Sequence, residues 1–487
     1  MNHNIIKNKS FSIIKRISTV LYLIFIFAGS IYPKDITLTI HLRGVSQSKI
    51  SLLHLNQSNI TSSVDIADSV HNGEITKFNI AGEILPGEFV LRFDYKTNGL
   101  SEPYPSEKRI IINDQDLELW VHPVYCNNTD STWFQKNERE NNVYSRFQKE
   151  NGDRKNVLGL LQDFLLKYDD TKSKFYKSAI SEYEKRRISF NKWLASQIEE
   201  NKSLFVSILF GFEYVPEIDW SGSAEERRLS FRKNYFDGID FSNPLLLKTS
   251  TLKQWMDRYV NLYGELATTI GLRDSLFTLA GKTAIEKVKT TNPQVYGWMV
   301  DYFYNGFESF NIEDGIKMLG QYINDPDCLA QKKEAIKRRL KGIETLFPGV
   351  VAPDIVIRDK GVGLFRLSSY KTEKKQILLI FWSADCSHCL ETISLLKQWY
   401  RNADKSRIPD IITISFDETD TEIQAWKKTV KELGDWTNLR VTEGFRSKIA
   451  GDYFIQGIPV LVLLNSNTRE IIALPDTAEQ LIILLSS

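Results

Sequence analysis

A pair of cysteines at a predicted junction between a strand and a helix constrains this fold more than any other feature of the sequence. The apolar run 377–381 predicts a buried strand, and Cys386 and Cys389 follow it closely. Beyond them, apolar side chains recur at helical spacing: Leu390, Ile393, Leu396 and Trp399. Because free amides and the helix dipole favour a thiolate at a helix N-terminus, Cys386 is predicted to be an acidic thiol. Cys389, nearly one turn along, can then attack a mixed disulfide formed by Cys386 and release the reduced partner.

Predicted strands and helices alternate through the region around this pair. The expected strands are residues 354–358, 364–367, 376–382, 411–417, 439–441, 460–464 and 469–474. One expected helix begins at Cys386, and three more cover residues 422–432, 447–453 and 477–485. This alternation predicts βαβ units, with helices covering both faces of a sheet and a terminal hairpin plus helix closing the chain.

Three motifs in this region resemble the TlpA-like (ResA-like) branch of the thioredoxin superfamily. They are Gly349-x-x-Ala352-Pro353-Asp354, Phe381-Trp382-x-x-x-Cys386-x-x-Cys389 and Gly457-Ile458-Pro459. The resemblance implies a thioredoxin-like α/β domain over residues 346–487. It also implies that Cys386 is the attacking thiolate, Cys389 the resolving thiol, and that the two form a redox-active disulfide.

The same resemblance assigns roles to three neighbouring residues. Pro459 would follow a cis peptide bond beside the dithiol. The backbone around Ile458 would pair with an extended substrate segment, a form of strand addition, and Trp382 would shield the dithiol. The implied chemistry is dithiol exchange with protein substrates, without a cofactor or a metal.

Residues close to the cysteines depart from the family pattern and leave the redox direction open. Ile380 stands where thioredoxin has a buried acid, so Asp385 and Glu391 become candidate proton acceptors for Cys389, although surface roles are favoured for both. A cationic or hydrogen-bonding His388 stabilises the Cys386 thiolate and favours an oxidant, whereas Asp385 acts in the opposite direction. The resemblance favours a reductase, while His388 favours an oxidase or isomerase.

Residues 1–30 are predicted to be a signal peptide. Basic residues precede the mostly apolar run 17–28, and the small residues Ala28, Gly29 and Ser30 suit signal peptidase. The apolar run is short for a membrane span, which needs about 20 residues, but an uncleaved anchor is the alternative. We therefore expect an exported protein of the periplasm or cell envelope.

The chain between the signal peptide and the cysteine domain changes character once. Residues 34–128 alternate apolar and polar side chains between turn residues, which predicts a small antiparallel, sandwich-like β domain. Residues 131–345 change to a helical period, which predicts an all-α domain. Residues 236–247 (FDGIDFSNPLLL) and 292–296 (NPQVY) are similar to an uncharacterised helical domain that precedes thioredoxin modules in envelope proteins of Bacteroidetes-type bacteria. The β region resembles the small N-terminal domain of the same architecture. The whole chain is thus predicted to be a multidomain α+β protein.

Charge and cysteine content exclude several other classes of protein. Lys plus Arg (62) nearly balances Asp plus Glu (61), so no overall field favours nucleic acid. Four cysteines are too few for a disulfide-stapled scaffold, and Cys126 and Cys328 are expected to be lone thiols. A zinc site would need two ligands beyond Cys386 and Cys389, and no ligand spacing supplies them.

The sequence therefore predicts an exported thiol–disulfide oxidoreductase, with reduction of envelope protein disulfides preferred. Its partners would be envelope proteins with thiols or disulfides, and a thiol donor that by family analogy is embedded in the membrane. One alternative is a binding protein that uses the thioredoxin fold as a platform without catalysis. Another is a thiol peroxidase, for which Ser383 is correctly spaced from Cys386 but Leu379 replaces the expected proline.

Overall fold

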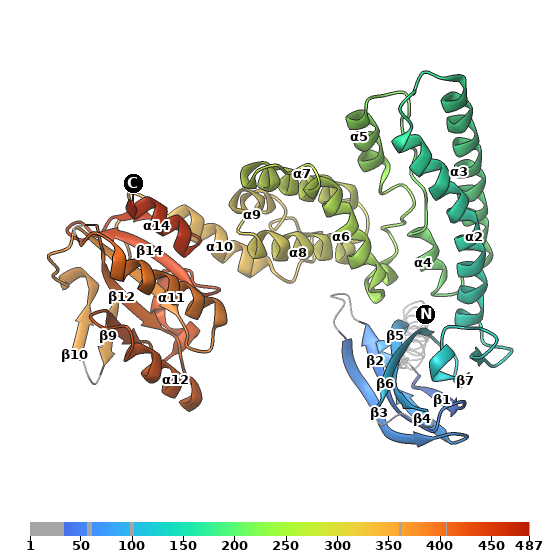
Figure 1. The fold of residues 1–487 in the computed structure, drawn as a ribbon, viewed down its shortest axis with the longest axis horizontal. Helices are drawn as coiled ribbons and strands as arrows, with labels where there is room; N and C mark the ends of the chain where they lie inside the picture. The colour runs from blue at the N-terminus through green and yellow to red at the C-terminus, as the bar shows by residue number, and fades with distance from the viewer. Residues whose placement is uncertain (1–33, 56–60, 98–101, 360–362, 406, 487) are drawn as a thin grey trace, which may run out of the picture. The chain divides into compact units, whose positions relative to one another are not determined.

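The computed structural model describes residues 34–55, 61–97, 102–359, 363–405 and 407–486 (Figure 1). The predicted signal peptide, residues 1–30, lies outside them. The chain divides into two compact units, Met1–Leu266 and Ala267–Ser487, so helices of the expected helical domain occur in both. Within the described ranges, no helix combines the length and apolarity needed to cross a membrane.

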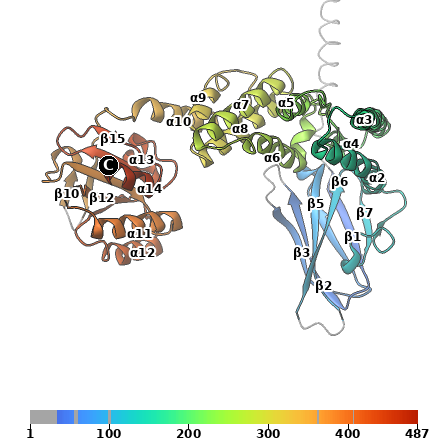
Figure 2. The ribbon, with the colours of Figure 1, turned by 45° about the horizontal axis from the view of Figure 1, so that its top comes forward.

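Two four-stranded sheets form the N-terminal part of the first unit (Figure 2). Their orders are β4-β1-β7-β8 and β3-β2-β5-β6. The strands are β1 (Ile36–Leu42), β2 (Gln47–Leu55), β3 (Thr61–His71), β4 (Ile75–Ile80), β5 (Gly87–Lys96), β6 (Tyr104–Ile112), β7 (Leu117–Val121) and β8 (Trp133–Phe134). Every second residue of β1 is buried, and both sheets contribute to one apolar core, as a sandwich requires.

One strand pairing differs from the predicted antiparallel arrangement. β1 and β7 run parallel, with Leu38 opposite Leu117 and Leu42 opposite Val121. The reason lies in the connection between them, because the chain passes through the second sheet before β7 returns beside β1. Alternation of apolar residues predicts a strand but carries no information about the direction of its neighbour.

After the sandwich, the described part of the first unit continues with the α-helices α2 (Glu140–Lys167), α3 (Lys174–Glu200), α4 (Ser207–Gly211), α5 (Ala224–Asn234) and α6 (Thr251–Gly264). Ser173 caps α3, and Ser223 forms a reciprocal capping box with Glu226 at the start of α5. Buried polar contacts join these helices to the sandwich. The Glu88 carboxylate of β5 accepts hydrogen bonds from the Thr249 hydroxyl at 2.5 Å and from the Ser250 amide at 2.7 Å.

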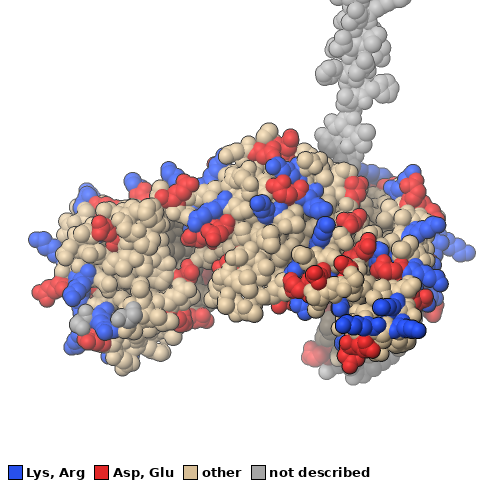
Figure 3. Space-filling model, turned by 90° about the horizontal axis from the view of Figure 1, so that it is seen from above, with Lys and Arg blue, Asp and Glu red and all other residues tan. Residues whose placement is uncertain are grey.

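The second unit begins with four helices: α7 (Ile270–Val288), α8 (Pro293–Ser309), α9 (Glu313–Leu319) and α10 (Lys333–Thr345). Asn292 caps α8, because its side chain accepts hydrogen bonds from the Gln294 and Val295 amides while Pro293 occupies the first turn. On the molecular face of Figure 3, basic and acidic side chains are interspersed.

The rest of the second unit contains a five-stranded sheet of order β13-β12-β11-β14-β15. Its strands are β11 (Gln376–Trp382), β12 (Asp410–Ser415), β13 (Thr437–Arg440), β14 (Val460–Asn465) and β15 (Ile471–Ala473). β11 pairs parallel with β12 and antiparallel with β14. A separate hairpin precedes the sheet, made of β9 (Val356–Asp359) and β10 (Gly363–Arg366).

Helices cover both faces of this sheet, as the alternation of strands and helices predicts. They are α11 (Ser387–Asn402), α12 (Asp420–Val430), α13 (Lys448–Asp452) and α14 (Ala478–Ser486). Successive residues of β11 belong to two different apolar cores. The core that includes Ile380 and Trp382 receives α11 and α14, and the core that includes Phe381 receives α13. This central strand ends where the cysteine motif begins.

Candidate functional site

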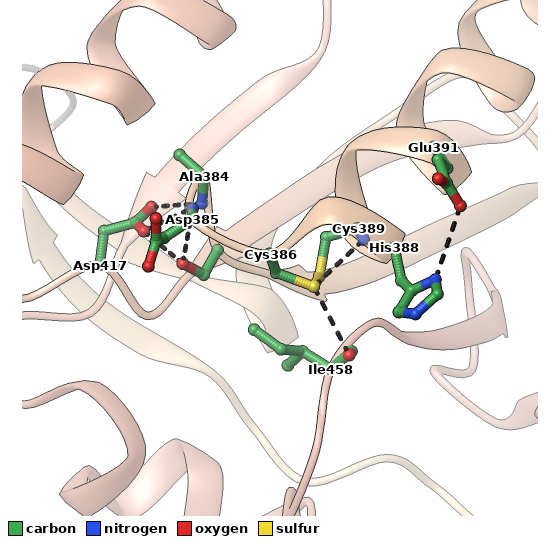
Figure 4. Close-up of a disulfide and its surroundings, with 9 residues drawn as sticks. Ala384, Asp385, Cys386, His388, Cys389, Glu391, Asp417 and Ile458 are labelled. Carbon is green, nitrogen blue, oxygen red and sulfur yellow. Dashed lines mark hydrogen bonds and ion pairs between the residues drawn. A yellow bond between two sulfur atoms is a disulfide. The ribbon is translucent and has the colours of Figure 1, made fainter. Parts of the chain in front are cut away.

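Cys386 and Cys389 form a disulfide at the N-terminus of α11 (Figure 4). Their Cα atoms are 5.2 Å apart. Cys386 is the N-cap residue of α11, with extended backbone angles, and its Sγ atom accepts the Cys389 amide hydrogen at 3.1 Å. In the reduced protein, the same amide would stabilise a negative charge on Cys386, because N–H groups at a helix N-terminus lack partners within the helix.

The two sulfur-bearing residues differ in accessibility. Cys386 is half-buried, whereas Cys389 is fully buried in the apolar core beneath α11. An approaching disulfide can therefore meet Cys386 first, and Cys389 lies behind it. The attacking role of Cys386 and the resolving role of Cys389 stay predictions.

The segment Ile458–Pro459 faces the disulfide from a neighbouring strand. β14 runs antiparallel to β11, with Val460 opposite Phe381, so the residues just before β14 lie beside the end of β11. The carbonyl oxygen of Ile458 is 3.7 Å from Cys386 Sγ, and the Ile458–Pro459 peptide bond is cis, the isomer that the family resemblance implies. The structure thus brings Cys386, Cys389, Ile458 and Pro459 together.

Trp382, at the end of β11, is fully buried. Trp382 and Cys389 belong to the same apolar cluster, and the partly buried Cys386 packs against that cluster. Its position is compatible with shielding of the dithiol, and that role stays a prediction.

Asp417 is a buried carboxylate that the sequence interpretation did not assign to the site. One carboxylate oxygen accepts hydrogen bonds from the Ser383 hydroxyl at 2.6 Å and the Ala384 amide at 2.9 Å. The other accepts a hydrogen bond from the Ser415 hydroxyl at 2.5 Å. Asp417 therefore fixes the short loop between β11 and Cys386 (Figure 4).

The one signal for Asp417 in the sequence is its place at the end of the buried run that contains β12. An acidic residue at the carboxyl end of a strand parallel to β11 lies near the end of β11 itself. The parallel pairing places Ser415 opposite Trp382. That register depends on the assembled sheet, so spacing along the chain alone does not identify Asp417 as a neighbour of the cysteine loop.

The other predicted site residues lie around the rim. His388 Nδ1 is 3.5 Å from Glu391 Oε2, and their side chains are 84% and 73% exposed. Asp385 is also exposed and lies on the Asp417 side of the disulfide, whereas His388 and Glu391 lie on the opposite side (Figure 4). In the part of the chain that the structure describes, the polar partners of Cys386 Sγ are backbone groups. The roles of Asp385 and Glu391 as candidate proton acceptors for Cys389 stay predictions.

The remaining cysteines are buried free thiols, as the sequence predicts. Cys126 Sγ donates to the Glu107 carbonyl oxygen at 3.3 Å. Burial raises the pKa of the Cys328 thiol, which keeps it protonated and unreactive. Across the described ranges, no group of three or more His, Cys, Asp or Glu residues is arranged to hold a metal ion.

Among solved structures, three from Bacteroides species illustrate what this chain is similar to. The thioredoxin domain of a thiol-disulfide oxidoreductase from Bacteroides vulgatus is 27% identical, with 29% of this chain and 96% of that chain covered and a TM-score of 0.25. A thioredoxin-like protein from Bacteroides caccae is 17% identical over 56% of this chain and 97% of that one, with a TM-score of 0.37. A thiol-disulfide oxidoreductase from Bacteroides fragilis is 24% identical, with 28% and 97% covered and a TM-score of 0.25.

No curated protein matches this chain. Residues 374–470 match a family model described as Thioredoxin-like. The matched residues begin just before β11 and end just before β15, so they contain the cysteine motif, Asp417 and the Ile458–Pro459 segment. The C-terminal part of this chain is therefore a thioredoxin-like domain.

Proposed function

We propose that this protein is an exported thiol–disulfide oxidoreductase that uses Cys386 and Cys389 to reduce disulfides of envelope proteins. One observation carries the proposal: a half-buried N-cap cysteine accepts a helix amide, and a buried second cysteine lies directly behind it. This geometry separates the reactive thiolate from the thiol that resolves the intermediate.

The reaction begins with attack of the Cys386 thiolate on a substrate disulfide. A Cys386–substrate disulfide forms, and the departing substrate sulfur leaves as a thiolate that takes up a proton. Cys389, after losing its proton, then attacks Cys386 Sγ. The Cys386–Cys389 disulfide forms and the second substrate sulfur leaves as a thiol. Two electrons pass from the dithiol to the substrate, and a dithiol donor must later reduce Cys386–Cys389 by the reverse exchange.

The surroundings of Cys386 support the first attack and the binding of a substrate segment. The Cys389 amide stabilises the attacking thiolate. The Ile458 carbonyl oxygen, 3.7 Å from Cys386 Sγ, can accept an N–H group from an extended substrate segment. The donor would be a second protein, for which a membrane-embedded thiol protein is the proposal that family analogy favours.

The geometry at Ser383 argues against the peroxidase alternative. A peroxidase of the type considered from the sequence would direct a hydroxyl near this position at the reactive sulfur. Here the Ser383 hydroxyl donates to Asp417 at 2.6 Å, and its oxygen accepts the Asp385 amide at 3.2 Å. The hydroxyl hydrogen is therefore used by Asp417.

A test of the proposal is reduction of insulin by the full chain with a dithiol donor. We expect turnover by the wild-type protein and by a Cys126→Ser, Cys328→Ser double variant, and none by Cys386→Ser. Cys389→Ser should accumulate a mixed disulfide with its substrate. An absence of cysteine-dependent turnover with every dithiol donor would instead favour the binding-protein alternative.

Export requires a separate experiment. Fractionation of the native cells and N-terminal sequencing of the mature chain should give a protein of the cell envelope that begins after residue 30. A full-length chain in the cytoplasm would contradict this part of the proposal.

A further inference from the structure

Helices α8 and α10 contact the segment that leads to Ile458. The Tyr304 hydroxyl of α8 donates to Gln456 Oε1 at 3.0 Å. The Gln456 side-chain amide in turn donates to the Ala335 carbonyl oxygen of α10 at 3.5 Å. Gln456 thus connects α8 and α10 to the segment that leads to Ile458, whose carbonyl oxygen faces Cys386.

The approach of α10 to this segment depends on a glycine. Gly342 lies inside α10, where glycine weakens a helix, and it is buried. A Cβ atom at Gly342 would lie 2.9 Å from Phe454 Cβ and 3.0 Å from Phe454 Cγ. Phe454 itself has a φ of 51°, in the left-handed region that side chains other than glycine rarely adopt. The absence of a side chain at Gly342 therefore allows the helix and the segment to touch.

Further contacts hold the same helices to the thioredoxin-like domain. Leu346, which follows α10, packs against the apolar core that includes Phe381. Arg339 of α10 donates to Asn311 Oδ1 at 3.1 Å, and the Asn311 amide donates to the Asp476 carboxylate ahead of α14. The contact at Gln456 is thus part of a wider interface within the second unit.

We infer that α8 and α10 are positioning elements of the redox site, in which Tyr304 and Gly342 hold segment 454–456 so that the Ile458 carbonyl oxygen is aligned for a substrate strand. The inference rests on the proposed function and extends it to the helical region. A backbone acceptor that is held in place before binding avoids the entropic cost of ordering it when the substrate arrives. Loosening the segment should therefore weaken binding of a polypeptide.

The two halves of the site should respond differently to such loosening. The thiolate of Cys386 is stabilised by the N-terminus of α11. Among the described residues, Tyr304 and Gly342 contact segment 454–456 and form no hydrogen bond with α11. A small disulfide such as cystamine needs no strand pairing with Ile458. Its reaction with the reduced protein should therefore be unaffected, while reduction of a polypeptide disulfide slows.

The experiment compares Tyr304→Phe and Gly342→Ala with two matched controls in the full chain. Tyr296→Phe removes a buried hydroxyl from the same helix, where it bonds Asp325 at 3.3 Å. Gly306→Ala adds a methyl group in α8 where no atom outside the adjacent residues and the helix's own backbone lies within 4 Å. KM and kcat are measured for insulin, and the rate of oxidation of the reduced protein is measured for cystamine. Hydrogen exchange of residues 454–458 reports the segment directly.

We expect Tyr304→Phe to raise KM for insulin about two- to tenfold, the effect of one neutral hydrogen bond, with kcat and the cystamine rate unchanged. Gly342→Ala should act in the same direction, and exchange at 454–458 should accelerate in both. The inference is overturned if Tyr304→Phe and Tyr296→Phe have the same KM for insulin. It is also overturned if Tyr304→Phe slows the reactions with insulin and with cystamine equally. A wild-type protein that turns over neither substrate removes the proposed function and the inference together.

Discussion

The closest polar contact of Cys386 Sγ is with a backbone group and not with the charged side chains around it. Its sulfur accepts the Cys389 amide at a fixed distance of 3.1 Å, in a partly buried setting. His388 Nδ1 and Glu391 Oε2 lie 3.5 Å apart on the helix surface, and the two side chains are 84% and 73% exposed, so water and salt screen their interactions. With this exposure, His388 is expected to influence the redox direction only weakly.

Replacement of His388 by alanine should therefore shift the reduction potential only slightly. An imidazolium stabilises the thiolate and hence the reduced form, so its removal should lower the potential, by roughly 5–20 mV for an exposed interaction. Equilibration with glutathione buffers, followed by thiol trapping, measures the shift. Glu391→Gln, as the control, should move the potential in the opposite direction. A fall of more than about 60 mV for His388→Ala would make His388 a principal determinant.

Asp417 should be important for stability and for the geometry of the cysteine loop. Asp417→Ala leaves the Ser383, Ser415 and Ala384 donors without their acceptor, which should lower the free energy of unfolding of the second unit by about 1–3 kcal/mol. Denaturant titration measures the loss, and insulin reduction should slow with it. Asp417→Asn keeps one acceptor oxygen and should lie between wild type and Asp417→Ala. Equal stability of Asp417→Ala and wild type would contradict this role.

At the scale of helices and strands, buried polar groups decide how elements meet. In the first unit, the Glu140 carboxylate at the start of α2 accepts hydrogen bonds from the Phe205 and Val206 amides at 3.0 and 2.8 Å. It also accepts one from the Asn113 side chain at 2.8 Å. One carboxylate thus joins the end of the sandwich, α2 and the segment before α4. Burial raises the pKa of Glu140 above its ordinary value of 4.5.

The raised pKa of Glu140 gives a pH dependence with a definite sign. The folded state favours the protonated acid, so the stability that this group contributes is fully present below pH 4.5 and falls as pH rises through the folded-state pKa. Glu140→Gln does not titrate. We subtract the unfolding temperature of Glu140→Gln from that of the wild type. This difference should fall as the pH rises from about 4 to about 7, the range of carboxyl titration. Calorimetry measures it, and a difference that grows with pH would contradict the prediction.

At the scale of the whole molecule, the chain is organised as two units that each contain their own apolar cores. The first unit has the sandwich core and the core between α2 and α3. The second has the two cores on either face of the five-stranded sheet. The division falls at Leu266 and Ala267, within the region that the sequence predicts as a single helical domain.

This organisation predicts that residues 267–487 form a stable protein when expressed alone. Because its cores and the Tyr304–Gln456 contact are internal, the fragment should unfold in one cooperative transition and reduce insulin with the KM of the full chain. Calorimetry and the insulin assay test both expectations. A fragment of residues 346–487, which lacks α8 and α10, is the comparison and should show a higher KM. Failure of the longer fragment to fold would mean that the first unit is required.

Local features of this protein could be predicted from its sequence. Strand β11, the start of α11 and the place of the Cys386–Cys389 pair all follow from an apolar run, a helical period and two cysteines within a short stretch of chain. The cap at Asn292 is equally local. Such features depend on neighbours along the chain, whose geometry the backbone fixes.

Tertiary structure alone decided the rest. The parallel pairing of β1 with β7 depends on the path of the chain through a second sheet. The contact of Asp417 with the cysteine loop bridges 33 residues, and that of Tyr304 with Gln456 bridges 152. Register and helix packing bring these residues together, because hydrogen bonds form between whichever groups the assembled cores leave face to face. The sequence by itself determined a pair of cysteines at the start of a helix, and the packed structure determined which distant residues hold that pair in place.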